Sequence, residues 1–400
     1  MGVYDLGMVC ALASGSLFLI AATLFGLPVS TTHTIVGAVL GMTIVATHVL
    51  CIKWLWPGLM KIVASWFISP VLAGVLSVLL HMLIKKTVLD TLTPLRRAYI
   101  ALPILTGSTV LVLTMLILYQ QSQLPLWETA AISFGVGAGV WGLVHFGALG
   151  RVKRRIEEST IEMNSLKYEN IDDALKNSKD GDGVLEEEEE KLAEEENGSG
   201  AAKENEESAI LKAESEEMNL LMSGSALEQA KAYRVFMYLQ IFTATLKSFA
   251  HGANDVANAA GPFAAVQGMY FGQDPCSISA TIWVLILCGI GVILGLSISG
   301  HHVIKTIGTG LTELDFPTGF SIELGSTLSV VLASCVGMPV SSTHCQVGSV
   351  ICIGMYENGV KHVKWGMLNK IIVSWVVTVP IAAAVAGGFL WLALLIMSKV

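Results

Sequence analysis

Long apolar runs, separated by short polar segments, dominate the hydrophobic pattern of the chain. Seven of them come close to the roughly 20 residues that an α-helix needs to cross a bilayer. They lie at 9–25, 34–50, 61–83, 100–118, 129–147, 281–300 and 371–397. Three shorter or interrupted runs lie at 233–250, 322–336 and 345–356. Because backbone polar groups in lipid must be paired within the segment itself, the pattern predicts an all-α, polytopic membrane helix bundle with nine or ten membrane segments.

The composition agrees with a location in the lipid bilayer. Hydrophobic residues make up 53% of the 400 residues and charged residues only 14%, and the mean hydropathy is +0.64. A soluble protein of this length exposes far more charged side chains. The basic residues form only short clusters beside apolar runs, so we expect no binding of nucleic acid.

One segment, 151–232, departs from this composition. It holds 23 of the 32 acidic residues and 11 of the 24 Lys and Arg residues, and it includes the run EEEEEKLAEEENGSG. Such a segment cannot bury a core, so we predict a disordered linker between two membrane halves, 1–150 and 233–400. The alternative is a regulatory or partner-binding loop.

Basic residues indicate on which side of the membrane this loop lies. Lys85, Lys86, Arg96 and Arg97 flank one short connection, and RVKRR opens the acidic segment. Two membrane segments separate the two clusters, which places both clusters on the same side. The positive-inside rule then predicts that loop 151–232 is cytoplasmic.

A polar motif occurs twice in the chain. The segment GLPVSTTHTIVGAVLG (26–41) returns 311 residues later at the start of GMPVSSTHCQVGSVICIG (337–354). A second matched pair follows, KIVASWFISP (61–70) and KIIVSWVVTVP (370–380). Two such copies joined by a long loop indicate an internal duplication. In secondary transporters, duplications of this kind place the substrate site at the interface of the repeats, near the membrane midplane.

The repeated PVSxTH motif suits the start of a broken helix. Proline interrupts a helix, and the Ser and Thr residues after it can cap the free N–H groups of a new one. A helix N-terminus attracts anions, and hydroxyl groups add neutral donors for a tetrahedral oxyanion. The plainer interpretation is that each motif only kinks and caps a helix.

A further polar stretch, HGANDVANAAGP (251–262), lies within apolar sequence of helical length. An ionisable residue such as Asp255 is costly in a membrane segment and usually marks an ion pathway. On a helix, Asn254 and Asn258 share one face, with Asp255 beside them. We expect Gly252, Gly261 and Pro262 to permit close backbone approach and local unwinding of the segment 251–262. The unwinding would expose carbonyl groups beside the carboxylate. Such a cage suits Na⁺, and the amides could donate to an anion.

Histidines accompany these motifs. His33 and His344 follow the Ser/Thr clusters, and His251 precedes the acidic signature. No HExxH pair or other tight metal-ligand spacing is present, so we expect neither an enzyme nor a bound metal or cofactor. The preferred interpretation is that these histidines are hydrogen-bonded helix caps or proton-sensitive gates.

The combination of GANDVANA with PVSTTH and PVSSTH resembles the inorganic phosphate transporter (PiT) family, the type III sodium–phosphate cotransporters. The segments KIVASWFISP, FSIEL and THCQVGSV are also similar to members of this family. The resemblance covers both membrane halves. It implies two inverted repeats with broken or re-entrant helices at the midplane, and symport of inorganic phosphate with Na⁺ or, in some members, H⁺. It also implies a homodimer in the plasma membrane, with no cofactor besides the transported ion.

The resemblance assigns roles to particular positions. Phosphate contacts fall on two amides and six hydroxyl-bearing residues: Asn254, Asn258, Ser30, Thr31, Thr32, Ser341, Ser342 and Thr343. Cation binding falls on Asp255 and Asn254, with Glu323 as a further candidate. Glu323 is either a coupling-site carboxylate or a residue at the membrane edge. Lys247 either attracts the anion or, in the preferred interpretation, extends to the membrane interface.

One feature departs from the family pattern. Members of the family carry the GANDVAN signature once in each half, whereas this chain has it only in the second half. We expect the partner signature upstream of Met1, as in a truncated product or a shorter isoform. Two alternatives to a phosphate symporter therefore stay open, a non-transporting phosphate sensor or receptor and a non-functional truncated isoform.

Overall fold

The computed structural model describes residues 2–47, 49, 52–121, 124–159, 224–273, 278–308 and 314–398. Helices contain most of these residues, and none of the described residues lies in a β-strand. The predicted all-α fold is therefore confirmed. Most of the predicted acidic linker lies outside the described residues, which omit 160–223.

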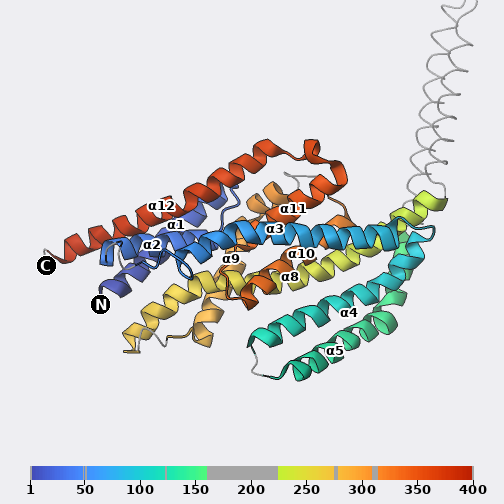
Figure 1. Cartoon of the computed structure of the whole chain (residues 1–400), viewed down its shortest axis with the longest axis horizontal. Coiled ribbons are helices and arrows are strands. Elements are labelled where there is room, and N and C mark those ends of the chain that lie inside the picture. The colour runs from blue at the N-terminus through green and yellow to red at the C-terminus, as the bar shows by residue number, and fades with distance from the viewer. Residues whose placement is uncertain are drawn as a thin grey trace, which may run out of the picture. The chain divides into compact units, whose positions relative to one another are not determined.

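The helices follow one another along the chain as Figure 1 shows. They are α1 (Val3–Leu24), α2 (Thr31–Thr47), α3 (Leu59–Ile84) with a π-helical end η2 (Lys85–Leu89), α4 (Pro94–Gln121), α5 (Leu126–Gly142) with a π-helical extension η3 (Leu143–Ala148), α8 (Gly224–Tyr270), α9 (Ile282–Gly308), α10 (Phe316–Cys335), α11 (Ser342–Asn358), the short η4 (Val360–His362) and α12 (Trp365–Met397).

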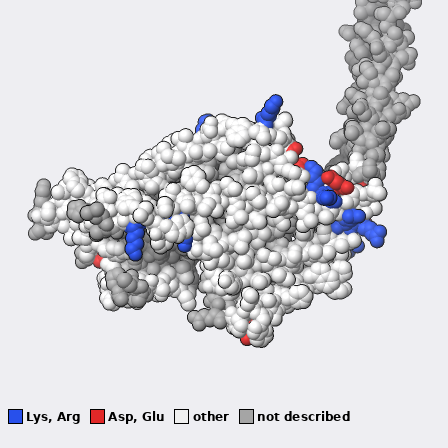
Figure 2. Space-filling model, in the orientation of Figure 1, with Lys and Arg blue, Asp and Glu red and all other residues white. Residues whose placement is uncertain are grey.

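Seven of the described helices are long and apolar enough to cross a membrane. They span Val3–Leu24, Leu59–Leu89, Pro94–Gln120, Leu126–Ser159, Ile282–Val303, Phe316–Cys335 and Trp365–Met397. The helix α2 is apolar but has only 17 residues, and α8 and α11 carry the polar motifs. These three helices account for the difference from the nine or ten segments expected from the sequence. Few charged side chains lie on the face of the molecule shown in Figure 2, as expected for a multi-pass membrane protein.

The described chain forms two compact units. Unit 1 comprises Met1–Ile84, Thr106–Ala138 and Met237–Val400, and unit 2 comprises Lys85–Leu105 and Gly139–Phe236. All the candidate site residues from the sequence belong to unit 1.

Within unit 1, the two copies of the repeated motif pack crosswise. The helix α2 of the first copy lies along α12 of the second copy, and α11 of the second copy lies along α3 of the first (Figure 1). Glycines make both contacts close. A Cβ atom on Gly37 would lie 2.6 Å from the Val379 carbonyl oxygen, and a Cβ on the matched Gly348 would collide with the Pro70 carbonyl oxygen. This exchange is the packing expected of two repeats related by a pseudo-two-fold axis.

Each copy contains a broken helix pair, as predicted. Gly26 and Gly337 follow two residues after the ends of α1 and α10, and their φ angles of 65° and 63° are in the left-handed region that glycine tolerates. The N–H groups of these glycines donate to Thr23 O and Ser334 O, both at 2.9 Å. A proline follows two residues later in each copy, so the chain leaves the helix and restarts as α2 or α11.

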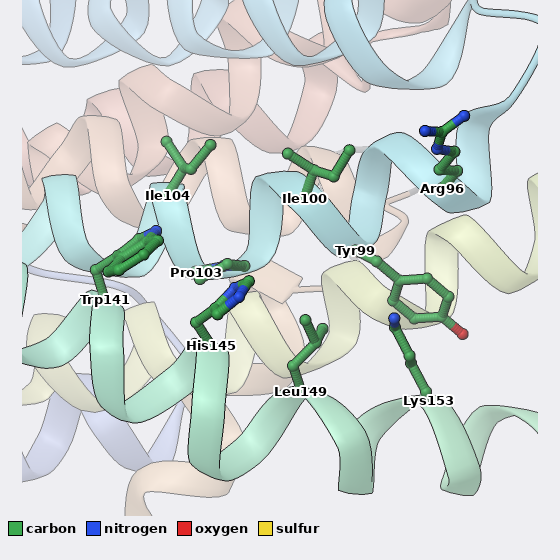
Figure 3. Close-up of a pocket in the computed structure, with 9 residues that line it drawn as sticks. All are labelled: Arg96, Tyr99, Ile100, Pro103, Ile104, Trp141, His145, Leu149 and Lys153. Atoms are coloured by element: carbon green, nitrogen blue, oxygen red, sulfur yellow. The ribbon is translucent and has the colours of Figure 1, made fainter.

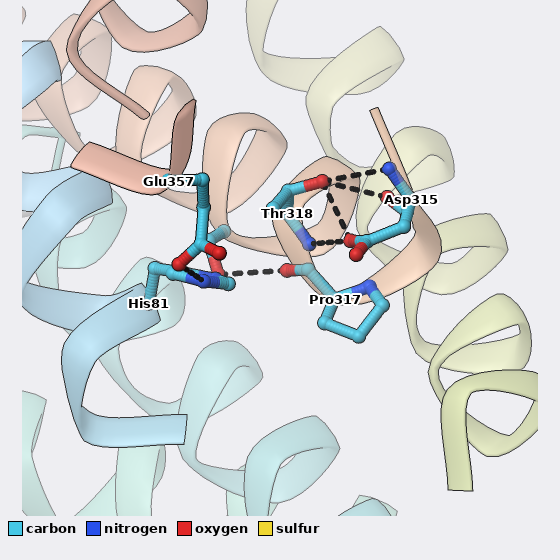
Figure 4. Close-up of polar contacts among 6 residues, drawn as sticks. His81, Asp315, Pro317, Thr318 and Glu357 are labelled. Atoms are coloured by element: carbon cyan, nitrogen blue, oxygen red, sulfur yellow. Dashed lines mark hydrogen bonds and ion pairs between the residues drawn. The ribbon is translucent and has the colours of Figure 1, made fainter. Parts of the chain in front are cut away.

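Polar contacts away from the motifs fix the beginning of α10 and the end of α11 (Figure 4). The Asp315 carboxylate accepts hydrogen bonds from the Thr318 N–H at 2.8 Å and the Thr318 hydroxyl at 2.7 Å, which caps α10. A 2.9 Å polar contact between His81 Nε2 and Glu357 Oε1 joins α3 to α11. The first contact fixes the start of α10, and the second holds α11 on α3.

The expected unwinding near Asp255 is not found. The helix α8 runs without a break from Gly224 to Tyr270 and includes Pro262. A Cβ on Gly252 or Gly261 would meet no atom of the described residues within 4 Å, so these glycines do not serve a close helix approach either. The helix tolerates Pro262 by giving up one hydrogen bond, because proline has no N–H to donate to the carbonyl of Asn258.

Candidate functional site

Two serines begin the helices that follow the broken segments. Ser30 precedes α2, and its Oγ accepts a hydrogen bond from the His33 N–H at 3.2 Å. Ser341 caps α11 in the same way, with the His344 N–H at 3.2 Å from its Oγ. Both side chains are buried. These two hydroxyls therefore act as helix caps in this structure, which is the plainer interpretation of the motif.

The next residue in each copy contacts the carboxylate of α8. The Thr31 hydroxyl donates to Asp255 Oδ1 at 3.3 Å, and the Ser342 hydroxyl lies 2.9 Å from Oδ2 and 3.2 Å from Oδ1. Thr31 and Ser342 are the first residues of α2 and α11, so Asp255 faces the N-termini of two helices. The positive ends of both helix dipoles stabilise a carboxylate there. The structure thus joins both repeats through one acidic side chain.

The two asparagines of α8 complete this cluster. Asn258 Nδ2 donates to the hydroxyls of Thr31 and Thr32, at 3.1 and 3.3 Å. Asn254 Nδ2 lies 3.3 Å from Asp255 Oδ1 and 3.4 Å from the Val340 carbonyl oxygen. Six of the predicted site residues therefore meet at one place. We call this group, Thr31, Thr32, Asn254, Asp255, Asn258 and Ser342, the Asp255 cluster.

Thr343, a further predicted phosphate contact, lies outside this network. It is half-buried, and none of the hydrogen bonds of the Asp255 cluster includes it. The second residue of α2, Thr32, donates instead to the Val340 carbonyl oxygen of the other copy at 3.2 Å. The two copies are thus similar but not identical in the bonds that they make.

Glu323, the further cation-binding candidate, belongs to a separate polar group. Glu323 Oε2 accepts a hydrogen bond from the Thr243 hydroxyl at 3.0 Å. Thr243 precedes Asp255 by 12 residues on α8, a rise of roughly 18 Å along the helix. The apolar sequence around Glu323 does not indicate which turn of α8 the Glu323 side chain contacts.

Lys247 lies in the same group. It does not extend to the membrane interface, which is the interpretation that the sequence favours. Its Nζ donates to Gln346 Oε1 on α11, and its charge interacts with that of Glu323. Ser326 donates to the same Gln346 oxygen at 3.2 Å. We call Thr243, Lys247, Glu323, Ser326 and Gln346 the Glu323 cluster.

Four rings pack against one another at the crossing of the two repeats. His33 lies 3.9 Å from Trp66 and 4.3 Å from His344, and His344 lies 3.6 Å from Trp375, measured between ring centroids. His344 Nδ1 is 3.2 Å from the Trp66 carbonyl oxygen. The His33 ring nitrogens are buried without a hydrogen-bond partner among the described residues. The rings therefore act mainly by packing, and the helix caps are the adjacent serines rather than the histidines.

The comparison with protein families decides what this site belongs to. Residues 1–386 match the phosphate transporter family. The chain belongs to the phosphate transporter family. The resemblance found in the sequence motifs is therefore confirmed.

Individual members of the phosphate transporter family match over nearly all of the chain. A protein of Pyrococcus furiosus described as a candidate phosphate permease is 30% identical over 95% of this chain and 75% of its own length. Human sodium-dependent phosphate transporter 1 is 27% identical over 97% of this chain and 84% of its own length. A solved structure described as the sodium-dependent phosphate transporter is 28% identical, with a TM-score of 0.74 over 99% of this chain and 82% of that one.

A cavity reaches the site of this phosphate transporter family member. It has a volume of about 480 Å³ and lies between α2, the segment 52–62 and α8. Its walls include Val36 and Val39 of α2, and Asn258 and Pro262 line its α8 side. The exposed Lys53 also lines it. The cavity thus has Asn258 and the basic side chain of Lys53 in its lining.

Sequence reasoning missed Thr243 and Gln346, which hold Glu323 and Lys247. Polar residues recur every three to four positions along α8, at Gln240, Thr243, Lys247, His251, Asp255 and Asn258. This spacing marks one helix face, and it could have revealed the Glu323 cluster. Gln346 gives a weaker signal, because the first copy of the motif has Ile35 at the matched position.

Proposed function

We propose that the chain is a Na⁺-coupled symporter of inorganic phosphate that works by alternating access around the Asp255 cluster. One observation carries this proposal. Asp255 accepts hydrogen bonds from Thr31 and Ser342, which occupy matched positions in the two repeats. A carboxylate held between two repeats is a site that a rocking movement of one repeat against the other can open to either side.

The contacts of Asp255 suggest how the two solutes are coupled. The Thr31 and Ser342 hydroxyls donate to the carboxylate, so their hydrogens are not available to an anion. A Na⁺ ion bound to Asp255 would take over the carboxylate oxygens and release both hydroxyls. The same ion would cancel the negative charge that repels phosphate. Phosphate would then bind where its cation has already bound.

The remaining ligands of the proposed site are assigned by chemistry. Na⁺ is a hard cation that takes oxygen ligands, as Ca²⁺ and Mg²⁺ do. The Asp255 carboxylate, the Asn254 amide oxygen and the carbonyl of Asn258, which Pro262 leaves without its usual donor, can supply them. The amide nitrogens and released hydroxyls would face phosphate, together with Thr32 and Thr343. Ser30 and Ser341 would act through the helix ends that they cap.

We keep Glu323 as a second cation-binding position, separate from Asp255. Its partner Lys247 reduces its affinity for a cation, because two positive charges would then share one carboxylate. A cation at Glu323 would therefore compete with Lys247. This competition would make the Glu323 cluster a step on the ion path rather than the main binding site.

We further infer the setting in which the transporter works. It would be a homodimer in the plasma membrane, built from halves 1–150 and 233–400, with the loop 151–232 in the cytoplasm and no cofactor besides the transported ion. The basic residues Lys85, Lys86, Arg96 and Arg97, with RVKRR at the start of the loop, support the orientation.

Uptake of ³²P-phosphate tests the proposed function. Cells that lack phosphate transport would express the full chain, with Na⁺ replaced by choline at fixed pH. We expect uptake that requires Na⁺ and that falls to background in Asp255→Asn, because the neutral amide cannot bind the cation. Asp90→Asn removes an exposed carboxylate outside the cluster, and we expect it to transport normally.

Surface biotinylation would show that each variant reaches the membrane. Uptake that persists in choline at fixed pH would contradict coupling to Na⁺. Phosphate binding by a chain at the cell surface that shows no uptake would replace the symporter with a sensor or receptor.

A further inference from the structure

A groove lies within unit 2, between α4 and the helix Leu126–Ser159 that contains α5 and η3 (Figure 3). Its volume is about 320 Å³. Side chains of α4 form one wall, and Trp141, His145, Leu149 and Lys153 form a row along the other helix. The two rows run along helices that are long and apolar enough to cross a membrane. The groove therefore has its long axis along these two helices.

The two ends of the groove differ in chemistry. Ile100, Ile104 and Trp141 are 55%, 52% and 39% exposed, and they make one end apolar. Arg96 and Lys153, both exposed, lie at the other end. From Arg96 to Ile104 the rise along α4 is about 12 Å, and from Lys153 to Trp141 the rise is about 18 Å. A ligand that fills the groove must therefore be charged at one end and apolar at the other.

The basic end is held in place and is positive overall. Lys153 Nζ lies 5.2 Å from the centre of the Tyr99 ring, a cation–π contact that positions the ammonium group (Figure 3). Further basic residues adjoin it in the sequence, at Arg97, Arg151, Arg154 and Arg155. Glu157, one helical turn beyond Lys153, is the acid that interacts with Tyr99. Two cations thus line the groove against this one acid beside it.

We propose that this groove binds an anionic phospholipid, with the headgroup at Arg96 and Lys153 and the upper part of an acyl chain along Ile100, Ile104 and Trp141. Free phosphate would have no use for the exposed apolar wall, whereas a lipid fills both ends. Basic pockets between membrane helices are known to suit anionic headgroups of the cytoplasmic leaflet. The basic end also coincides with the residues that mark the cytoplasmic side of the chain. This binding site is separate from the transport site and does not depend on it.

Native mass spectrometry of the purified full chain tests this binding. The protein in detergent would be titrated with dioleoyl phosphatidylserine or with dioleoyl phosphatidylcholine, which has the same acyl chains but no net charge. We expect a clear preference for phosphatidylserine. In the double variant Arg96→Gln/Lys153→Gln we expect the ratio of the two affinities to fall roughly tenfold or more, because each basic residue contributes separately to anionic lipid binding.

Three further variants separate groove binding from attraction to a basic surface. Arg154→Gln/Arg155→Gln removes the same charge outside the groove lining and should keep the preference. Ile104→Trp fills the apolar end without changing any charge and should reduce binding of both lipids. Glu157→Gln should increase the preference for phosphatidylserine. Size-exclusion chromatography would confirm that each variant keeps its fold. We expect the fold to be kept, because the substituted side chains are exposed.

Two results would overturn the proposal. One is an equal loss of the preference for phosphatidylserine in the double variant and in the Arg154/Arg155 control. That result would mean that any basic residue on this surface attracts the lipid equally well. The other is unchanged lipid binding in Ile104→Trp, which would mean that no acyl chain enters the groove.

Discussion

At the residue scale, the two hydroxyls on Asp255 are the contacts on which the proposed transport cycle depends. Thr31 and Ser342 each donate to Asp255 from a different copy of the motif. Loss of either hydroxyl therefore leaves the carboxylate bonded to only one copy. A hydrogen bond to a charged group contributes about 1.5–3 kcal/mol. Loss of one such bond therefore has a measurable effect on binding, even where the fold is kept.

We expect Ser342→Ala and Thr31→Val each to lower phosphate uptake at limiting phosphate by roughly 10–100-fold, which is the rate equivalent of that bond energy. Thr31→Ser keeps the hydroxyl and should retain most activity. Ser297→Ala removes an exposed hydroxyl of α9 that, within the described part of the chain, bonds its own helix at Ile293 O, and it should transport normally. Equal activity of Thr31→Val and Thr31→Ser would show that this hydroxyl has no part in the site.

Glu323 gives a second prediction at this scale. Because Glu323 contacts α8 at Thr243, 12 residues before Asp255, loss of the two carboxylates should have different consequences. We expect Glu323→Gln to change the Na⁺ concentration needed for half-maximal uptake while phosphate binding to the purified chain persists. Asp255→Asn should abolish both. Isothermal titration calorimetry with phosphate in saturating Na⁺ distinguishes the two variants. Loss of phosphate binding in Glu323→Gln would place both carboxylates in one site.

At the element scale, small residues allow the crosswise packing of the repeats. Gly37 and Gly348 each face a backbone carbonyl of the other repeat, so an added methyl group must push two helices apart. We expect Gly37→Ala to lower the melting temperature of the full chain in detergent, since the nearest atom belongs to the backbone and cannot move alone.

Gly291→Ala of α9 is the matched control, because a Cβ there meets no atom of the described residues within 4 Å. This change should leave stability equal or slightly higher, since alanine favours the helix by up to about 1 kcal/mol. A Gly37→Ala protein as stable as the parent chain would mean that α2 and α12 are not fixed at this distance.

The sequence predicts the repeats, the broken helices and the Asp255 cluster because each leaves a local signal. Thr31 and Ser342 stand in a motif that occurs twice, and Asp255 is an isolated acid in apolar sequence. The continuity of α8 through Pro262 is not predictable from local propensity, which favours a break. The position of Glu323 also depends on the register of α10 against α8, and an apolar run does not encode that register.

At the scale of the whole molecule, Asp255 connects Na⁺ binding to phosphate binding and both to the arrangement of the repeats. Such coupling is reciprocal, because each ligand must change the affinity of the other by the same factor. We expect Na⁺ to raise the affinity of the purified full chain for phosphate, and phosphate to raise its affinity for Na⁺ equally. Calorimetric titrations in both orders measure the two factors. Independent binding of the two ligands would contradict the proposed coupling.

The crosswise packing also has a consequence for the synthesis of the protein. The helix α2 ends at Thr47, and its partner α12 begins only at Trp365, 318 residues later. At a ribosomal speed of about 5–20 residues per second, the first repeat waits roughly 15–60 s in the membrane for the helix that covers its glycines. The first half cannot complete its core as it is made. Folding of this bundle must therefore wait until α12 has been made, and any factor that protects nascent membrane helices would act during that interval.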